Sequence, residues 1–372
     1  MTTPCSIKPQ RRNHQRAEHY AAVCGPPARA LALLLSAHGM LGSGGVSRTT
    51  CAGEIKRWWS MGIVTSRPRI ILDCDPGHDD AMAILLAGRH TELLGITTVS
   101  GNAPLAMTTH NALVCTQMFD LAVPVHAGAD RPLIVAARHA TEVHGATGLD
   151  GPTLPILHRE AASRDAVRFI IDTVRQHQDV WLVPIGPLTN IALALRQAPD
   201  IITRIAGISL MGGSSTVGNV TPVAEFNVWA DPHAAAIVFA SAVPIRMCGL
   251  NLTHQFCVDE QTIGVLREMH SNTGTFAADL FDFYLRSSFA RTGRKRAPLH
   301  DPCAVLALTH PGLLQGTAYS VAVETNGALT RGMTVIDKRG LASVPPANCL
   351  VYESIDQDAA MATFLETAAT YK

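Results

Sequence analysis

Four carboxylates stand within eight residues, directly after an apolar run, in the stretch ILDCDPGHDDA. Carboxylates at this density repel one another, and each would protonate or stay solvated unless a cation neutralised them. Asp73 and Asp75 alternate with Cys74, so they share one face of the predicted strand. Asp79 and Asp80 follow a Pro-Gly turn into a predicted helix. Capping of the helix N-terminus explains one or two of the acids, but not the pair on the strand.

The ligand atoms on offer indicate which cation this acidic stretch would hold. The four acids supply only oxygen, and oxygen ligands select a hard cation such as Ca²⁺ or Mg²⁺ over zinc. No His or Cys pair stands nearby at zinc spacing. We expect His78 to point to a different side from its acidic neighbours, where it faces solvent or supports the site from behind.

Further polar groups follow later apolar runs. The segment LHDPCAV sets His300 beside Asp301 at a predicted helix start, and VAEFNVWADP carries Glu225, Asn227 and Asp231. Taken singly, Asp301 would be a helix cap and His300 a structural histidine. The glycines of MGGSSTVGNV lack the spacing of a dinucleotide or phosphate loop.

The order of predicted elements brings these groups together. From residue 67 onward, apolar strands such as RIILDCD, LLGITTVSGN and VWLVPIG alternate with helices. Helices are expected over 79–89, 104–119, 161–177, 188–197, 231–240, 259–269, 273–289 and 357–369, with another opening at HDPCAVLAL. This alternation is typical of a mostly parallel sheet covered on both faces. We therefore predict an α/β fold, with one large domain, a Rossmann-like central sheet covered by helices, and a few C-terminal strands.

Polar side chains recur just after the predicted strands, where parallel sheets bind ligands. Besides the acidic stretch, they include Asn102, the residues around Ile185, the segment 211–227, and Asn251. This convergence predicts one site. The segment 129–157 is rich in Gly, Pro and His and is expected to be a long loop of the kind that covers sites.

Residues 1–65 differ from the rest because they show no sustained period. We interpret them as a disordered leader or an over-extended start, with the folded domain over 66–372. The short apolar run ARALALLLSA gives only a weak secretory signal.

The bulk composition excludes several classes of function. The 372 residues include 30 Lys and Arg against 30 Asp and Glu, so the net charge makes no case for nucleic acid or an anionic membrane. No run of 18 apolar residues predicts a transmembrane helix. Nine scattered cysteines argue against a disulfide scaffold and for a reducing, cytoplasmic setting.

Several motifs occur in a specific order: DCDPGHDDA, GN after the second strand, VPIGPLTNIA, LMGG…GN…AEFN, and HDP. In this the chain resembles the nucleoside hydrolases of the inosine-uridine-preferring type, from about residue 69 to the C-terminus. The resemblance implies hydrolysis of the N-glycosidic bond of ribonucleosides to ribose and free base. It further implies a role in nucleoside catabolism and in purine and pyrimidine salvage, and a homodimer or homotetramer.

The resemblance also implies residue roles. One Ca²⁺ would be bound by Asp75, Asp80, Asp301 and the backbone carbonyl of Ile185. Substrate would contact Asp79, Asn102, His144, Met211, Asn219, Glu225 and Asn227, with His144 closing over the base. Asp75 would be the general base for water, and His300 the general acid for the departing base. The chemistry agrees, because glycosidic cleavage passes through an oxocarbenium-like sugar that needs an activated water and help for the leaving group.

The chain departs from the family ahead of HDP. Relatives often present an aromatic or amide side chain to the base there, whereas this chain has Ser288, with Tyr284 and Phe289 nearby. The base preference therefore stays open between purine and pyrimidine. The basic residues from Arg291 to Arg296 are interpreted as a solvated helix end or mobile segment.

Two alternatives are kept. A haloacid dehalogenase-like phosphatase also begins with Asp-x-Asp after a strand, but it needs a different following residue and a suitably placed Lys. A Ca²⁺-dependent ribonucleoside-binding protein without catalysis would share the fold. Such a binder needs no proton-transfer pair like Asp75 and His300.

Overall fold

The computed structural model describes residues 67–372, so the predicted leader lies outside the described residues. Nine strands form one sheet in the order β10-β9-β11-β6-β5-β4-β1-β2-β3. The strands of this sheet are β1 (Arg69–Cys74), β2 (Glu92–Thr98), β3 (Val125–Ala127), β4 (Val180–Pro184), β5 (Ile205–Met211), β6 (Ile245–Cys248), β9 (Leu314–Val323), β10 (Thr334–Asp337) and β11 (Cys349–Ile355). The strands from β3 to β11 are mutually parallel, while β9 and β10 extend the sheet antiparallel. The predicted α/β class is confirmed.

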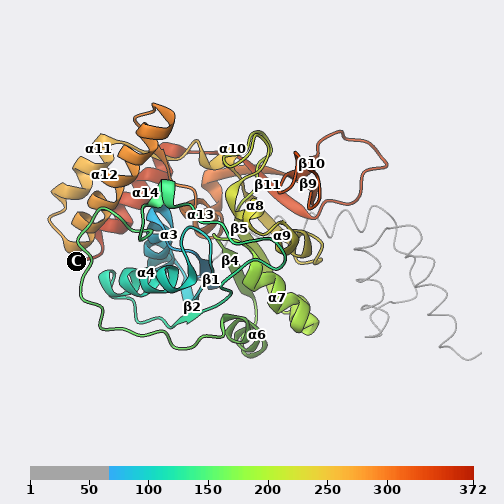
Figure 1. The fold of residues 1–372 in the computed structure, drawn as a ribbon, viewed down its shortest axis with the longest axis horizontal. Coiled ribbons are helices and arrows are strands. Elements are labelled where there is room, and N and C mark those ends of the chain that lie inside the picture. The colour runs from blue at the N-terminus through green and yellow to red at the C-terminus, as the bar shows by residue number, and fades with distance from the viewer. Residues whose placement is uncertain (1–66) are drawn as a thin grey trace, which may run out of the picture.

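Helices cover both faces of the sheet. They are α3 (His78–His90), α4 (Leu105–Met118), α5 (Thr141–His144), α6 (Ala166–Gln176), α7 (Thr189–Gln197), α8 (Phe226–Ala230), α9 (Pro232–Phe239), α10 (Leu250–Thr253), α11 (Glu260–Glu268), α12 (Asn272–Thr292), α13 (Pro302–Thr309) and α14 (Gln357–Ala369). One apolar core joins the sheet to α3, α4, α12, α13 and α14, and a second joins it to α6, α7 and α9. Figure 1 shows these two groups of helices on opposite sides of the central strands.

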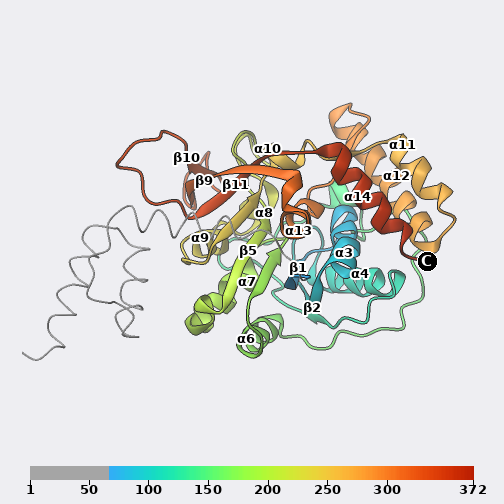
Figure 2. The same cartoon turned by 180° about the vertical axis from the view of Figure 1, so that it is seen from behind.

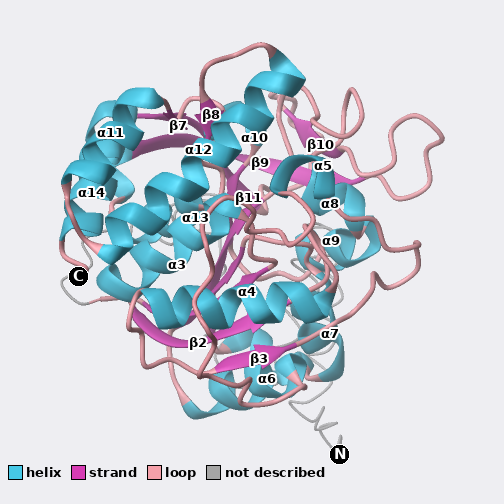
Figure 3. Ribbon diagram, turned by 60° about the vertical axis from the view of Figure 1, so that its left-hand side comes forward, coloured by secondary structure: helices cyan, strands magenta, loops and turns pink. Residues whose placement is uncertain are grey.

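The C-terminal part of the chain adds the last strands to one edge of the sheet and then packs α14 against the first apolar core. The view from behind shows the strands β9 and β11 leading toward α14, which ends the chain (Figure 2). A separate two-stranded sheet pairs β7 (Cys257–Val258) with β8 (Ala297–Pro298), close to α11 and α12 (Figure 3). In the described part of the chain, no helix is long and apolar enough to cross a membrane.

Two predicted helix boundaries were wrong for local reasons. The helix expected over 161–177 begins at Ala166, because the Asp165 side chain caps it by accepting a hydrogen bond from Arg168 N. The helix expected to end at residue 289 continues to Thr292 and ends at Gly293, which adopts a left-handed φ of 68°. Glycine accepts that conformation at low cost, so it terminates helices well.

The central strands aim their carboxyl ends at one place. β1 lies between β2 and β4, with Asp73 in register with Thr97 and Pro184. β1 is buried along nearly its whole length, which only a strand with helices on both faces can be. The residues that follow these strands therefore meet above one edge of the sheet.

Candidate active site

Three carboxylates meet at the floor of the site. One side-chain oxygen from each of Asp79, Asp80 and Asp301 lies within 4.8 Å of the other two, and all three residues are buried. Asp79 and Asp80 belong to the first turn of α3, and Asp301 directly precedes α13. These two helices pack against each other, so a late segment of the chain completes a cluster that begins at β1.

The turn between β1 and α3 positions Asp80. Its Oδ1 accepts a hydrogen bond from Asp75 N at 3.1 Å, and its Oδ2 accepts one from Gly77 N at 2.9 Å. Asn102 Nδ2 donates to the same Oδ2 at 3.2 Å. The Pro-Gly turn thus folds back on its own helix, and Asn102 ties the end of β2 to it.

Asp75 lies beneath this cluster with one oxygen uncommitted. Its Oδ2 accepts from Asn102 N at 2.6 Å, while its buried Oδ1 has no hydrogen-bond partner. Gly101 and Gly186 approach the Asp75 carboxylate so closely that a Cβ on either would collide with its oxygens. These two glycines, which follow β2 and β4, are therefore required by close approach rather than by a turn.

The electrostatics of the floor favour a cation. Burial, followed by repulsion from neighbouring carboxylates, raises the pKa of Asp75 and of Asp301 well above the usual range. Burial raises the pKa of Asp80 as well, and raises that of Asp79 to about 7. An all-oxygen cluster with an unpartnered buried oxygen beneath it fits a hard cation such as Ca²⁺. A cation there would favour the ionised form of each carboxyl group.

Ile185 and Asp73, which the sequence also pointed to, accept hydrogen bonds from neighbouring elements. The Ile185 carbonyl oxygen accepts from Asn227 Nδ2 at 2.9 Å. Asp73, the first acid of the stretch, is held by Thr97 Oγ1 at 2.6 Å and Asn190 Nδ2 at 2.8 Å. Burial raises the pKa of Asp73 to about 7. Asp73 therefore ties β1 to β2 and α7 beneath the site.

Glu225 and Asn227 form the wall opposite the acidic floor. The Glu225 carboxylate accepts from Gly213 N at 2.8 Å, Asn227 N at 2.8 Å and Val228 N at 3.1 Å. Burial raises its pKa to about 7. Asn227 Nδ2 also donates to the Met211 carbonyl at 3.2 Å. These bonds tie the start of α8 to the end of β5.

Asn219 lies on the exposed loop before α8. Its Oδ1 accepts from Phe226 N at 2.9 Å, so it shapes the loop that carries the Glu225 wall.

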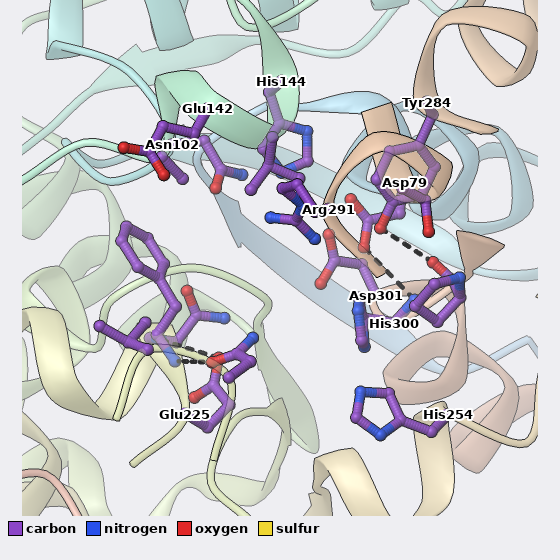
Figure 4. A pocket seen from close by; sticks show the side chains of 18 of the residues that line it. Asp79, Asn102, Glu142, His144, Glu225, His254, Tyr284, Arg291, His300 and Asp301 are labelled. Carbon is purple, nitrogen blue, oxygen red and sulfur yellow. Dashed lines mark hydrogen bonds between the residues drawn. The ribbon is translucent and has the colours of Figure 1, made fainter. Parts of the chain in front are cut away.

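His300 stands beside the floor and is neutral at pH 7. Its backbone N–H donates to Asp79 Oδ2 at 3.3 Å, and Thr253 Oγ1 lies 2.7 Å from its Nδ1. Burial, with the nearby cations as a smaller cause, lowers the pKa of His300 to about 3. Figure 4 shows His300 next to Asp79 and Asp301, with His254 farther along the same wall.

The expectation that His78 faces solvent was wrong, and the alternative of a supporting position is the one observed. Its Nε2 donates to the Asp150 carbonyl at 2.8 Å, and its Nδ1 lies 3.0 Å from Nδ1 of His144. The ring stacks against His144, Phe283 and Tyr284, and His144 also stacks against Tyr284. His78 is fully buried, and this burial lowers its pKa to about 4.

The long loop carries His144 over the site. Residues 129–157 are mostly irregular, as predicted, but α5 within them ends at His144. Ser287 Oγ of α12 donates to the Val143 carbonyl at 3.0 Å, which fastens this part of the loop to α12. The His144 side chain is buried, and its Nδ1 lies 3.0 Å from Nδ1 of His78.

A cavity of about 1160 Å³ joins these groups, which is large enough for a nucleoside-sized ligand. Of the predicted site residues, its lining includes Asp79, Asn102, His144, Ile185, Met211, Asn219, Glu225, Asn227, His300 and Asp301. Asp75 and Asp80 lie behind that lining. The lining also includes Arg138, Glu142, Tyr284 and Arg291, which the sequence did not single out as site residues. The sequence signal for Arg291 was Gly293. Glycine often terminates helices, and its position indicates that α12 continues past the predicted end and includes Arg291.

The fold and the site define a class of enzyme. Residues 70–362 match the family model of the inosine-uridine preferring nucleoside hydrolases, and the chain belongs to this family. It is thus an N-glycosyl hydrolase of the nucleoside hydrolase class, as the motifs predicted.

Particular relatives narrow the comparison. The chain is 43% identical over 293 residues to the pyrimidine-specific ribonucleoside hydrolase RihB of Escherichia coli strain K12, an alignment that covers 78% of this chain and 93% of RihB. The solved structure of a purine-preferring ribonucleoside hydrolase from Gardnerella vaginalis matches with a TM-score of 0.77 and 33% identity, over 81% of this chain and 98% of that one. An inosine-guanosine nucleoside hydrolase matches with a TM-score of 0.76 and 27% identity, over 82% and 100%.

Proposed function

We propose that the protein hydrolyses the N-glycosidic bond of ribonucleosides to ribose and free base, with Ca²⁺ bound at the acidic floor. The observation that carries the proposal is the cluster of Asp79, Asp80 and Asp301 beside His300 in one cavity. Because the chain belongs to the nucleoside hydrolase family, the phosphatase alternative is excluded. The proposed ligands are Asp75, Asp80, Asp301 and the carbonyl oxygen of Ile185. To bind the metal, this carbonyl oxygen would give up the hydrogen bond that it accepts from the Asn227 amide.

The chemistry needs a nucleophilic water on one face of the sugar. Bound Ca²⁺ would supply a water of lowered pKa and a fixed position for the ribose diol. Asp75 would take the proton from that water, because its Oδ1 has no hydrogen-bond partner and the bound cation would keep its carboxyl group ionised. Asp79, Asn227 and Asp301 would hold the 2′ and 3′ hydroxyls.

The remaining residues would position the two ends of the substrate. Asn219 and Glu225 would face the 5′ end, Met211 would line the sugar, and Asn102 would lie near the water. His144 would close over the base. Excluding water by such a covering segment strengthens every charge interaction inside the site.

His300 would donate the proton to the departing base. Its pKa of about 3 in the free protein leaves the ring neutral at pH 7. Negative charge developing on the base would favour the protonated ring, since a nearby opposite charge stabilises a cation. Good general acids contribute roughly 10²–10⁴ in rate.

The test is ribose release from inosine, uridine and adenosine, with and without a strong Ca²⁺ chelator, for wild type and His300→Ala. We expect chelator-sensitive release and a loss of roughly 10²–10⁴ in kcat for the variant, while substrate binding is retained. Ca²⁺-dependent binding of ribonucleosides without any release would instead support the binding protein. One relative is named pyrimidine-specific and another purine-preferring, so the same assay with uridine and inosine determines the base preference of this protein, and a homodimer or homotetramer stays a prediction.

A further inference from the structure

Arg291 brings a cation into the cavity from the last turn of α12. It belongs to the lining, and Figure 4 shows its side chain between His144 and Asp301. Its charge acts on both sides of the cavity, because it contributes to lowering the pKa of His144 and of His300. The guanidinium therefore faces the space between the covering histidine and the proposed acid.

Arg291 has no carboxylate partner within the described part of the chain. No Asp or Glu oxygen there lies within 4.0 Å of its guanidinium, whereas Arg286 of the same helix pairs with Asp282 at 3.0 Å. A guanidinium carries five N–H donors and no acceptor, so an unpaired one in a cavity is available to a ligand that supplies acceptors.

The neighbouring hydroxyl groups of α12 are already committed as donors. Tyr284 Oη donates to the Pro298 carbonyl at 3.0 Å, and Ser288 Oγ donates to the Arg296 carbonyl at 3.0 Å. Thr292 Oγ1 donates to the carbonyl of Ser288 at 2.8 Å. Among these cavity-lining residues of α12, Arg291 is the one whose donors have no partner in the described chain.

We propose that Arg291 recognises the carbonyl oxygen at C4 of a pyrimidine or C6 of a purine, so that the enzyme favours keto bases over amino bases. This inference rests on the proposed function, since it assigns the base end of the same cavity. A guanidinium donates to the C4 carbonyl oxygen of uracil or the C6 carbonyl oxygen of hypoxanthine, whereas the amino group that cytosine or adenine carries at the same position offers it a second donor. The same cation would stabilise negative charge that builds on a keto base as the glycosidic bond breaks.

The test compares nucleosides that share one ribose. The value of kcat/KM is measured for uridine against cytidine and for inosine against adenosine, in wild type, Arg291→Met, Arg291→Lys and Arg286→Met. Arg291→Met keeps an apolar stem and removes the donors, while Arg286→Met removes a charge from the same helix outside the cavity. Thermal unfolding and circular dichroism confirm that each variant is folded.

We expect Arg291→Met to lower kcat/KM for uridine and inosine by roughly 10- to 100-fold, the range for a lost hydrogen bond to a charged group. Cytidine and adenosine should change little, Arg291→Lys should fall between, and Arg286→Met should keep the wild-type ratios. Equal losses for keto and amino nucleosides, or no loss at all, would overturn the proposal.

If wild type releases no base from any ribonucleoside, the proposed hydrolysis fails, and base preference is read from calorimetric affinities for uridine and cytidine. A uridine preference that disappears in Arg291→Met supports the role of Arg291 without catalysis. Affinities that keep the same ratio in the variant overturn it.

Discussion

Buried carboxylates in two regions of this protein have different neighbours. Asp231 is fully buried, yet its oxygens accept from Ala234 N at 3.0 Å, Leu133 N at 2.8 Å and Thr189 Oγ1 at 2.8 Å. The acidic floor instead sets Asp79, Asp80 and Asp301 against one another. Burial therefore does not by itself mark a metal site, and neither does a lack of donors, since Asp80 also accepts three hydrogen bonds; the convergence of three carboxylates on one point does.

Removing a floor carboxylate should have the largest effect. Asp80→Asn should lower kcat/KM for ribonucleosides by more than roughly 100-fold, since even supporting residues around metals cost 10- to 100-fold. Asp231→Asn should keep most of its activity in the folded fraction. Steady-state ribose release checks both variants. An active Asp80→Asn variant that still loses activity to chelator would contradict the assignment of Asp80 as a ligand.

Bound Ca²⁺ should raise the free energy of unfolding only through the carboxylates of the acidic floor. Free Ca²⁺ at about 100 times its Kd should raise the free energy of unfolding by about 2.7 kcal/mol relative to chelated protein. Thermal unfolding with Ca²⁺ or with chelator measures this difference. Asp231→Asn should show the same gain and Asp80→Asn a reduced one. If Ca²⁺ does not change the thermal unfolding of the wild type, the contrast between the acidic floor and Asp231 is removed.

Replacing Asp231 should lower the free energy of unfolding and leave the catalytic activity of the folded protein nearly unchanged. In Asp231→Asn, an NH₂ group replaces one carboxylate oxygen, so it faces either the Ala234 N donor at Oδ1 or the Leu133 N and Thr189 Oγ1 donors at Oδ2 and can accept from none of them. Leaving buried donors unpaired should cost about 1–3 kcal/mol in the free energy of unfolding. Denaturant titration measures it, with Asp165→Asn at the exposed α6 cap as the mild control. An unchanged midpoint would show that these donors find other partners.

The pH dependence of metal binding should be the smallest effect. Burial raises the pKa of Asp79 to about 7, and burial with repulsion from neighbouring carboxylates raises the pKa values of Asp75 and Asp301 well above their usual range. At pH 6 the metal-free carboxyl groups hold protons that Ca²⁺ must displace, so affinity should fall as pH falls. The loss is roughly tenfold per pH unit for each proton released. Calorimetry in two buffers of different ionisation enthalpy counts the protons, and an affinity equal at pH 6 and pH 8 would contradict the raised pKa values.

Much of the fold was predictable because its signals are local. Near-continuous apolar strands between helices indicate a parallel sheet wherever they occur, and α14 (Gln357–Ala369) has the predicted boundaries. The end of α12 was missed although Gly293 signals it. Arg291 to Arg296 are exposed at the end of this helix and beyond it, as predicted, but Arg291 also lines the cavity. The orientation of His78 had no such signal, because its partners His144 and Asp150 lie far along the chain.

The sequence by itself determined the chemistry that was possible: a dense run of acids after a buried strand, a His-Asp-Pro segment, and the order of motifs that marks the family. Only the tertiary structure decided which oxygens meet, because Asp301 joins Asp79 and Asp80 through the packing of α13 on α3. It also decided which buried acids are satisfied, as both oxygens of Asp231 are held by donors while one oxygen of Asp73 and one of Asp75 have none. Residue type fixes what a side chain can donate or accept, and long-range packing fixes the partners within its reach.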